Sequence, residues 1–314
     1  MTDDARNILV VAHARRPDTV LAARRVIAAV AAAGATAVLP PDDAELRDEL
    51  GDVGALATLG DDVAVTDLEL AVVLGGDGTI LRAAELVRTG SAPILGINMG
   101  HVGFLAEIEA DVIDDAMRRV LARDYTVEER MTLDVEVRGP DGEFIYETWA
   151  LNEATVEKAA RERMMEVVME IDGRPLSSFG CDGVVIATPT GSTAYNFSAG
   201  GPVIWPTVEA IAVVPLSAHA LFARPLVLAP DSTVAIEVLQ RTDGVGILWC
   251  DGRRSHDLPP GARVVARRSA EHVRLARLHP APFTDRLVRK FQLPVTGWRG
   301  PDVPTDSRPL GVAP

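Results

Sequence analysis

The chain has 314 residues, of which 47% are hydrophobic and 24% are charged, a balance typical of a folded globular protein long enough for two domains. Its formal net charge of −14 argues against nucleic acid or an anionic membrane as the main partner, but not against an anionic small molecule bound by a few placed arginines. No apolar run approaches the roughly 18 residues of a membrane span, the N-terminus lacks the pattern of a secretory signal, and the two cysteines form no CxxC pair. We therefore expect a cytoplasmic protein with ordinary thiols.

The first third of the chain alternates apolar runs with helical patterns. Residues 7–12 (NILVVA) are typical of a buried parallel strand, and residues 17–34 predict an amphipathic helix that ends at glycine. This alternation indicates a mostly parallel, Rossmann-like sheet with helices on its faces. The segments that follow are strands at 36–39, 68–74 and 93–98, helices at 79–90 and 110–124, and an acidic stretch at 42–52 that is either a helix or a loop.

From about Met131 the pattern changes to strands and tight turns. Residues 132–137 alternate, GPDG at 139–142 is a turn, and residues 143–157 predict a long second arm of a hairpin. We expect stacked sheets or a sandwich here, followed by a helix at 281–294 and a loose tail rich in Pro, Gly and Asp. The other strands of this region are 183–188, 210–214, 233–240, 245–250 and 263–268, together with a hairpin that turns at Asp172-Gly173.

The turn Gly75-Gly76-Asp77-Gly78-Thr79 lies between a predicted strand and a predicted helix. Glycines let a backbone approach a ligand closely, and a helix N-terminus offers free amides to an anion. The motif is not a Walker A loop, because neither GxxxxGKS nor GxxxxGKT occurs in the chain, and it is not a dinucleotide fingerprint, because Leu81 stands where the third glycine of GxGxxG would be. Asp77 either caps the helix, or it orients and deprotonates an attacking hydroxyl or holds a magnesium ion. These residues alone leave both interpretations open.

Two further segments contain candidate ligand-binding residues. Asn152 and Glu153 point to opposite faces of a regular strand, so both reach one ligand only at a bend or bulge. Asp182 precedes a strand that ends in PTGSTAY (189–195), whose small and hydroxyl-bearing residues fit either a wrap around a polar ligand or an ordinary connection. The nearby cations Lys158, Arg161 and Arg163 are surface charges or phosphate contacts.

Taken together, these motifs resemble the NAD kinase family. GGDGT follows a strand, ALNE (150–153) comes about 75 residues later, and DGVVIATPTGSTAYNFSAGGP (182–202) follows in the expected order. GGDGT alone is shared with diacylglycerol and sphingosine kinases, whereas the TPTGSTAY block with an upstream ALNE is specific. GINMGHVGFLAE (96–107) and the segment 281–298 support a similarity over nearly the whole chain.

The resemblance implies an activity and an architecture. Family members transfer a phosphoryl group from ATP, or in some cases from inorganic polyphosphate, to the 2′-hydroxyl of the adenosine ribose of NAD, giving NADP. They require a divalent metal, here expected to be Mg²⁺, and form homodimers or homotetramers. The implied fold is an α/β domain at residues 1–129 and a β-rich NAD-binding domain at 130–280, with residues 281–314 returning to pack on the first domain.

The resemblance also assigns roles to residues. Asp77 is the proton acceptor for the ribose hydroxyl, Gly76 and Gly78 face phosphate, Asn152 and Glu153 bond the bound NAD, Asp182 contacts its nicotinamide side, and Phe104 lies beside the adenine. The other implied nucleotide-binding positions are Thr79, Arg82, Arg163, Thr190, Thr193, Ala194, Tyr195, Asn196 and Ser198. One departure is Arg253 in Asp251-Gly252-Arg253, where many members have DGQ, so any contact made by that glutamine is not transferred.

Two other functions are compatible with parts of the sequence. A lipid kinase shares GGDGT, but it would need an apolar or basic membrane-facing surface, which the acidic composition disfavours. A non-catalytic sensor that binds NAD(H) would share the nucleotide pocket, but every expected catalytic position is present here. The sequence therefore favours NAD 2′-kinase activity.

Overall fold

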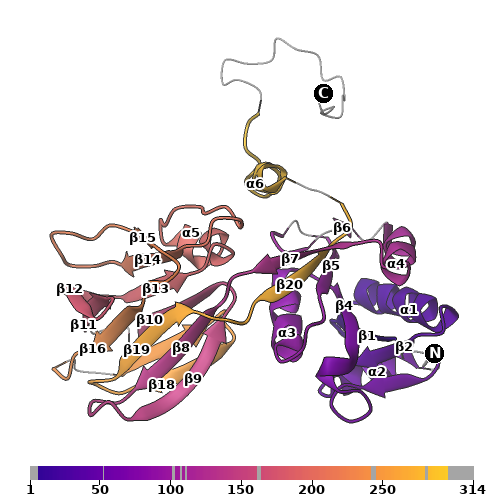
Figure 1. Cartoon of the computed structure of the whole chain (residues 1–314), viewed down its shortest axis with the longest axis horizontal. Helices are drawn as coiled ribbons and strands as arrows, with labels where there is room; N and C mark the ends of the chain where they lie inside the picture. Colours follow the sequence, from indigo (N-terminus) through magenta and orange to yellow (C-terminus); the bar gives the residue numbers. More distant parts are fainter. Residues whose placement is uncertain are drawn as a thin grey trace.

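The structure is a computed structural model that describes residues 6–51, 53–100, 103–106, 108–109, 112–160, 164–241, 245–279 and 282–295. An α/β region that includes the N-terminal part of the chain lies beside a β-rich region formed mainly by the second half (Figure 1). The strands β7 (Thr126–Arg130) and β20 (Val273–Arg277) lie where the two regions meet. In these ranges no helix is long and apolar enough to cross a membrane.

The α/β region is built on one mostly parallel sheet. Eight strands of the described chain take part, in the order β3-β2-β1-β4-β5-β20-β7 with β6 attached to β5. β1 pairs in parallel with β2 and β4, and β4 pairs in parallel with β5, as the strand–helix alternation predicts. The bounds are β1 Asn7–Ala12, β2 Thr36–Leu39, β3 Leu56–Thr58, β4 Leu68–Leu74, β5 Ile94–Asn98 and β6 Ile108–Glu109.

Helices cover both faces of this sheet. One face packs against the apolar sides of α1, α2 and α4, and the other packs against α3. Because both faces are covered, β1 and nearly all of β4 are buried, which explains their continuous apolar runs. Within the acidic segment at 42–52, Ala44–Leu50 forms a helix, since Leu46 and Leu50 bury one side of it. The helices are α1 Pro17–Ala32, α2 Ala44–Leu50, η1 Val65–Asp67, α3 Asp77–Val87 and α4 Ile113–Leu121.

The β-rich region is a sandwich of two antiparallel sheets, as predicted. The strand orders are β15-β14-β13-β10-β17-β18 and β12-β11-β16-β19-β8-β9, and apolar side chains from both sheets form one shared core. The bounds are β8 Leu133–Arg138, β9 Phe144–Ala150, β10 Glu153–Lys158, β11 Met165–Ile171, β12 Arg174–Cys181, β13 Gly183–Ala187, β14 Ile211–Leu216, β15 Leu226–Leu228, β16 Val234–Val238, β17 Gly246–Cys250, β18 Arg254–Leu258 and β19 Arg263–Arg268, with η3 Gly191–Thr193 and α5 Tyr195–Ser198 after β13.

The segment 143–157, expected as one long hairpin arm, is two strands that belong to different sheets. β9 pairs with β8 and ends at Ala150, whereas β10 begins at Glu153 and pairs with β13 and β17. Leu151 and Asn152 form a bend between the two strands. Leu151 is fully buried in the core under α3, so the chain turns there toward the α/β region. The single-arm prediction is therefore wrong.

The chain re-enters the α/β region before residue 281, the expected point of return. β20 pairs in parallel with β5 and antiparallel with β7, and Val273 and Leu275 are buried in the core that contains α3. The terminal helix α6 (Phe283–Phe291) follows and contacts both regions. The Phe291 ring centroid lies 5.7 Å from that of Phe104 and 4.4 Å from that of Phe197.

Candidate active site

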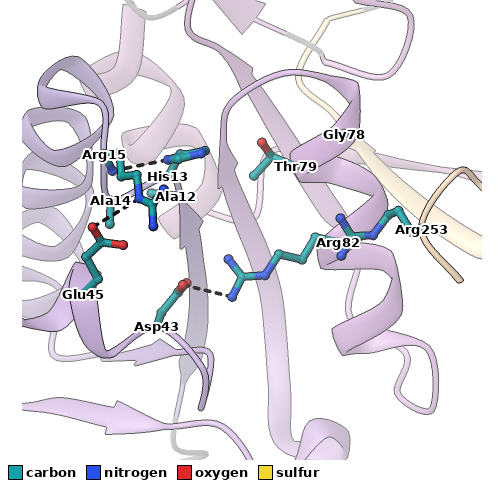
Figure 2. A pocket seen from close by; sticks show the side chains of 10 residues that line it. All are labelled: Ala12, His13, Ala14, Arg15, Asp43, Glu45, Gly78, Thr79, Arg82 and Arg253. Atoms are coloured by element: carbon teal, nitrogen blue, oxygen red, sulfur yellow. Dashed lines mark hydrogen bonds and ion pairs between the residues drawn. The ribbon is translucent and has the colours of Figure 1, made fainter.

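The order of the strands creates a binding position at one edge of the sheet. From β1 the chain first adds β2 and β3 on one side of the sheet and then β4 and β5 on the other. The switch point, where the direction of strand addition reverses, therefore lies between β1 and β4. Ligands of open α/β sheets bind beyond the carboxyl ends of the strands at such a point. A cavity of about 570 Å³ lies there (Figure 2), and its walls are Ala12, His13, Ala14, Arg15, Asp43, Glu45, Gly78, Thr79, Arg82 and Arg253.

The GGDGT turn ends β4 and begins α3, and Asp77 does not cap this helix. Gly76 is the N-cap residue, and no described side chain bonds the first turn. Instead, the Asp77 carboxylate accepts hydrogen bonds from the backbone amides of Phe104 and Leu105, both at 3.0 Å. A Cβ atom on Gly103 would lie 2.3 Å from Asp77 Oδ1, so this approach requires glycine. Asp77 is thus aimed at the loop after β5. The Thr79 amide donates to Gly76 O at 3.0 Å, so the amides of Asp77 and Gly78 are those of this turn left for a ligand.

Three arginines line the cavity, and each is held by acidic side chains. Arg82 Nη2 donates to Asp42 at 2.7 Å and to Asp43 at 3.0 Å. Arg15 lies 3.4 Å from Glu45, and Arg253 reaches the cavity from the β17–β18 turn of the second region. The cavity therefore presents cations beside the start of α3, which is a suitable environment for phosphate groups.

The bend at Leu151 and Asn152 is held by Asp251, which our sequence reasoning did not single out as a site residue. Its buried carboxylate accepts from the amides of Leu151 (3.0 Å), Asn152 (2.7 Å) and Glu153 (3.3 Å) and from Arg254 Nη2 (2.6 Å). Burial raises the pKa of Asp251, while these donors oppose that rise. The only signal in the sequence was an Asp-Gly pair suited to a tight turn, and Asp251 indeed has a φ of 55°.

Glu153 is a buried carboxyl group at the start of β10. Burial, followed by repulsion from Asp251, raises the pKa of Glu153 to about 8, although the amide of Tyr195 donates to its Oε2 at 3.3 Å and opposes this. At neutral pH most Glu153 side chains therefore retain their proton. Because Glu153 follows a bend rather than lying within a continuous strand, the constraint that placed Asn152 and Glu153 on opposite faces does not apply.

The TPTGSTAY segment packs directly against this bend. Thr188 Oγ1 donates to Leu151 O at 2.5 Å, and the Thr188 amide donates to Asn152 O at 2.9 Å. A Cβ atom on Gly191 would lie 1.9 Å from Asn152 O, so only glycine fits there. The two motifs recognised in the sequence, ALNE and TPTGSTAY, are thus adjacent in space.

Several candidate residues of this segment serve its internal structure. Asn196 is fully buried, and its amide nitrogen donates to Ser192 O and Pro202 O at 3.2 and 3.0 Å. Thr190 is also buried, and its carbonyl accepts from Thr193 Oγ1 at 3.3 Å. By contrast, Tyr195 and Ser198 are exposed and Ala194 is half-buried.

The remaining candidates lie at the margins of the site. Asp182 is paired with Lys158 Nζ at 2.5 Å, and this bond, with a second from Ser217, lowers the pKa of the Asp182 carboxyl. Phe104 is only 7% exposed, because it packs against the rings of α6. Arg163 falls outside the described residues.

A chain of polar contacts joins the GGDGT helix to the Asp251 turn. Glu85 of α3 accepts from Arg253 Nε at 3.0 Å and from Arg253 Nη2 at 3.1 Å, and it lies 3.2 Å from Arg254 Nε. Arg254 and Arg88 also lie over the Trp149 ring, at 4.5 and 4.4 Å from its centroid. The helix that begins at Asp77 is therefore tied to the bend that positions Glu153.

Within the described ranges, no group of three or more His, Cys, Asp or Glu side chains is arranged to hold a metal ion. A magnesium ion bound to a nucleotide does not require such a cluster of protein ligands. Mg²⁺ that accompanies a nucleotide is held by one or two carboxylates, by phosphate oxygens and by water. Asp43 lines the cavity, and its buried Oδ2 has no hydrogen-bond partner among the described residues, so the residues present fit a phosphate-bound magnesium ion.

Comparison with solved structures identifies the fold. The crystal structure of yeast NADH kinase complexed with NADH matches with a TM-score of 0.82 and 22% identity over 94% of this chain and 91% of that one. The NAD kinase from Archaeoglobus fulgidus in complex with ATP matches with a TM-score of 0.68 and 24% identity, covering 91% and 98% of the two chains. This chain therefore has the two-domain fold of these kinases, an α/β domain followed by a β-rich domain.

Sequence comparisons extend beyond the fold. The chain is 64% identical to the NAD kinase of Leifsonia xyli subsp. xyli, over 95% of this chain and 98% of the relative. It is 56% identical to the NAD kinase of Thermobifida fusca, over 96% and 94% of the two chains. Models of the ATP-NAD kinase N-terminal and C-terminal domains match residues 8–125 and 151–278. The chain therefore belongs to the NAD kinase family.

Proposed function

We propose that this chain transfers the γ-phosphoryl group of ATP to the 2′-hydroxyl of the adenosine ribose of NAD and so makes NADP. The observation that supports this most directly is the placement of Asp77. Its carboxylate lies at the phosphate-facing start of α3 and is fixed by two backbone amides rather than used as a helix cap. The full-length relatives named NAD kinase support the same activity.

The donor phosphates occupy the cavity at the switch point. Gly76, Gly78 and Thr79 present the first turn of α3 to them, and Arg82 offers guanidinium nitrogens from the wall. Both described bonds of Arg82 use Nη2, so Nε and Nη1 are oriented by those bonds and have no acceptor among the described residues. Phosphoryl transfer depends mainly on positioning and charge neutralisation, which these groups provide.

The acceptor NAD lies against the bend and the TPTGSTAY segment. Asn152 and Glu153 are held for it by Asp251, and the protonated Glu153 carboxyl donates a hydrogen bond that an ionised carboxylate could not. Exposed Tyr195 and Ser198 line the ribose and base. The side chains of Asn196 and Thr193 instead hold the loop through bonds to its backbone carbonyls. Asp182 meets the nicotinamide side.

Asp77 acts as the general base. It accepts the proton of the 2′-hydroxyl while that oxygen attacks the γ-phosphorus, and the bond to the ADP oxygen breaks. The two amides that bond Asp77 occupy two of its four lone-pair positions, so its orientation is set and two lone pairs remain to accept the hydroxyl proton. When bound, Mg²⁺ neutralises phosphate charge in the transferring group.

Four further properties are proposed from the family resemblance and the composition. Polyphosphate shares the phosphoanhydride chemistry of ATP and is an alternative donor for the same cavity. The protein acts in the cytoplasm, with Mg²⁺ as its metal. It assembles as a homodimer or homotetramer, which size-exclusion chromatography with light scattering will measure directly.

The experiment that tests the proposal is a coupled assay of NADP formation. Purified protein is incubated with NAD, Mg²⁺ and either ATP or polyphosphate, and the product is identified chromatographically. We expect NADP with ATP and none when NAD is omitted. Tight NAD binding without NADP formation under any donor or metal would favour a sensor, and phosphorylation of diacylglycerol micelles alone would favour a lipid kinase.

A further inference from the structure

Arg253 is the cavity arginine that comes from the second region of the protein. It follows the turn at Asp251 and Gly252, whose φ values of 55° and 63° direct the chain back toward α3. Its guanidinium makes a two-nitrogen bond to Glu85, and its side chain is 36% exposed. Figure 2 shows Arg253 entering the cavity from a different ribbon than Arg82, so the wall of this cavity is shared by the two regions.

Glu85 has a second cation available if Arg253 leaves. Arg254 Nε lies 3.2 Å from Glu85 Oε1, yet this buried nitrogen makes no hydrogen bond with any described residue. A small rotation of Glu85 would satisfy it. Release of Arg253 therefore leaves no unpaired carboxylate and removes an unsatisfied donor, which lowers the free-energy cost of the exchange.

The same exchange is unfavourable for Arg82. Its partner Asp43 is largely buried, with 12% of its side chain exposed, and Asp43 Oδ2 already lacks a hydrogen-bond partner in the described chain. Withdrawal of Arg82 would leave a buried carboxylate without its cation, which is strongly destabilising. Arg82 therefore keeps its bonds to Asp42 and Asp43 when a ligand binds, whereas Arg253 can be transferred to the ligand.

We propose that Arg253 is a donor-binding residue supplied across the interface between the two regions: Glu85 holds it when the cavity is empty, and the donor phosphates take it over on binding. The inference rests on the proposed function, because it assigns the cavity to a phosphoanhydride. A guanidinium binds phosphate and carboxylate through the same two-nitrogen geometry, so the two acceptors compete for one cation. Donor binding thereby links the β17–β18 turn, which contains Asp251, to the donor through the Arg253 side chain.

The test measures binding of two probes to the full chain by titration calorimetry: a non-hydrolysable ATP analogue and inorganic tripolyphosphate, each with Mg²⁺. For Arg253→Gln we expect the donor Kd to rise about 10- to 100-fold for both probes, as for the loss of a charge-assisted hydrogen-bonded pair. The Kd for NAD should change less than about twofold. Arg241→Gln is the matched control, because Arg241 is an exposed arginine that also bonds a glutamate, at 2.6 Å from Glu166, away from the cavity.

Glu85→Gln separates donor binding from a purely structural link. If Glu85 only holds Arg253, this variant binds the donor as well as the wild type or a few-fold more tightly. An equal loss of donor affinity in Glu85→Gln and Arg253→Gln, or an unchanged donor Kd in Arg253→Gln, overturns the inference. The inference is also overturned if Arg253→Gln weakens binding of the ATP analogue alone, because the phosphate chain is the only part that the two probes share.

These outcomes also separate the inference from the proposed function. A wild-type protein that makes NADP while Arg253→Gln keeps its donor Kd refutes the inference alone. A wild-type protein that binds the donor through Arg253 but makes no NADP refutes the proposed reaction and retains the donor site. If the wild type binds neither probe, both proposals are wrong.

Discussion

Replacement of Asp251 by asparagine tests the buried carboxylate that holds the bend at Leu151 and Asn152. The substitution keeps the shape of the side chain but changes one acceptor oxygen into an NH₂ donor. Oδ1 accepts from the amides of Asn152 and Glu153, and Oδ2 accepts from the Leu151 amide and Arg254. In either orientation, two donors of the protein would face the new NH₂ group.

The size of the effect follows from these contacts. Two hydrogen bonds to a charged group are lost, at about 1.5–3 kcal/mol each. Arg254 also loses one of its two carboxylate partners, while Glu85 stays 3.2 Å from its Nε, so this cost lies at the low end of the about 3–5 kcal/mol for a broken buried pair. Because the two contributions share the Arg254 bond, they overlap rather than add, and relief of the repulsion with Glu153 offsets a small part. We therefore expect the free energy of unfolding to fall by about 3–5 kcal/mol.

The measurement is chemical denaturation followed by circular dichroism, with NAD affinity measured in parallel. Asp257→Asn is the control, since Asp257 is an exposed residue of the neighbouring strand β18 and should change stability by less than about 0.5 kcal/mol. NAD affinity should fall in Asp251→Asn even where the protein remains folded, because the bend at Asn152 and Glu153 loses its anchor. A loss of stability below about 1 kcal/mol would refute the account of Asp251 as the organiser of this bend.

The remaining predictions concern three other positions. In Asp77→Asn we expect turnover to fall about 10²–10⁴-fold with NAD binding retained, as single-turnover kinetics and calorimetry will show; wild-type turnover would exclude the role of base. The pKa of Glu153 is raised from 4.5 to about 8, so its contribution to stability is present below pH 4.5 and is lost as the pH rises through about 8. In Glu153→Gln the decrease of unfolding free energy over this window should be shallower by up to about 1.4 kcal/mol per pH unit, and an unchanged slope would contradict the assignment. Gly191→Ala places a Cβ atom 1.9 Å from Asn152 O, so we expect a lower melting temperature and weaker NAD binding. Gly200→Ala is the comparison variant: no atom lies within 4 Å of the added Cβ, so it tests the backbone strain alone at its φ of 80°.

Local pattern was sufficient for much of the α/β region. The strands expected at 7–12, 36–39 and 68–74 have these bounds in the structure, because a strand covered on both faces must be apolar throughout and is ended by glycine or polar residues. The hairpin at Asp172-Gly173 was likewise predictable, since both residues take positive φ there, as a tight turn between β11 and β12 requires.

Short strands that depend on distant partners were not predictable in this way. β20 has only five residues and was missed, because its place in the first sheet is set by pairing with β5 and β7, far earlier in the chain. The bend at Leu151 was also hidden, since the continuous run from 143 to 157 has the composition of one strand. It becomes a bend only because Leu151 is buried under α3 of the other region.

The sequence by itself therefore determined the elements that local periodicity and turn chemistry specify, and its motifs indicated the family and the candidate residues. Only the tertiary structure decided how these residues are held. Asp251 lies about 100 positions from the amides it bonds, and Arg253 lies 168 positions from Glu85. The physical reason is that hydrogen bonds and ion pairs between such distant residues exist only after both regions have folded, so they leave no periodic signal in either segment.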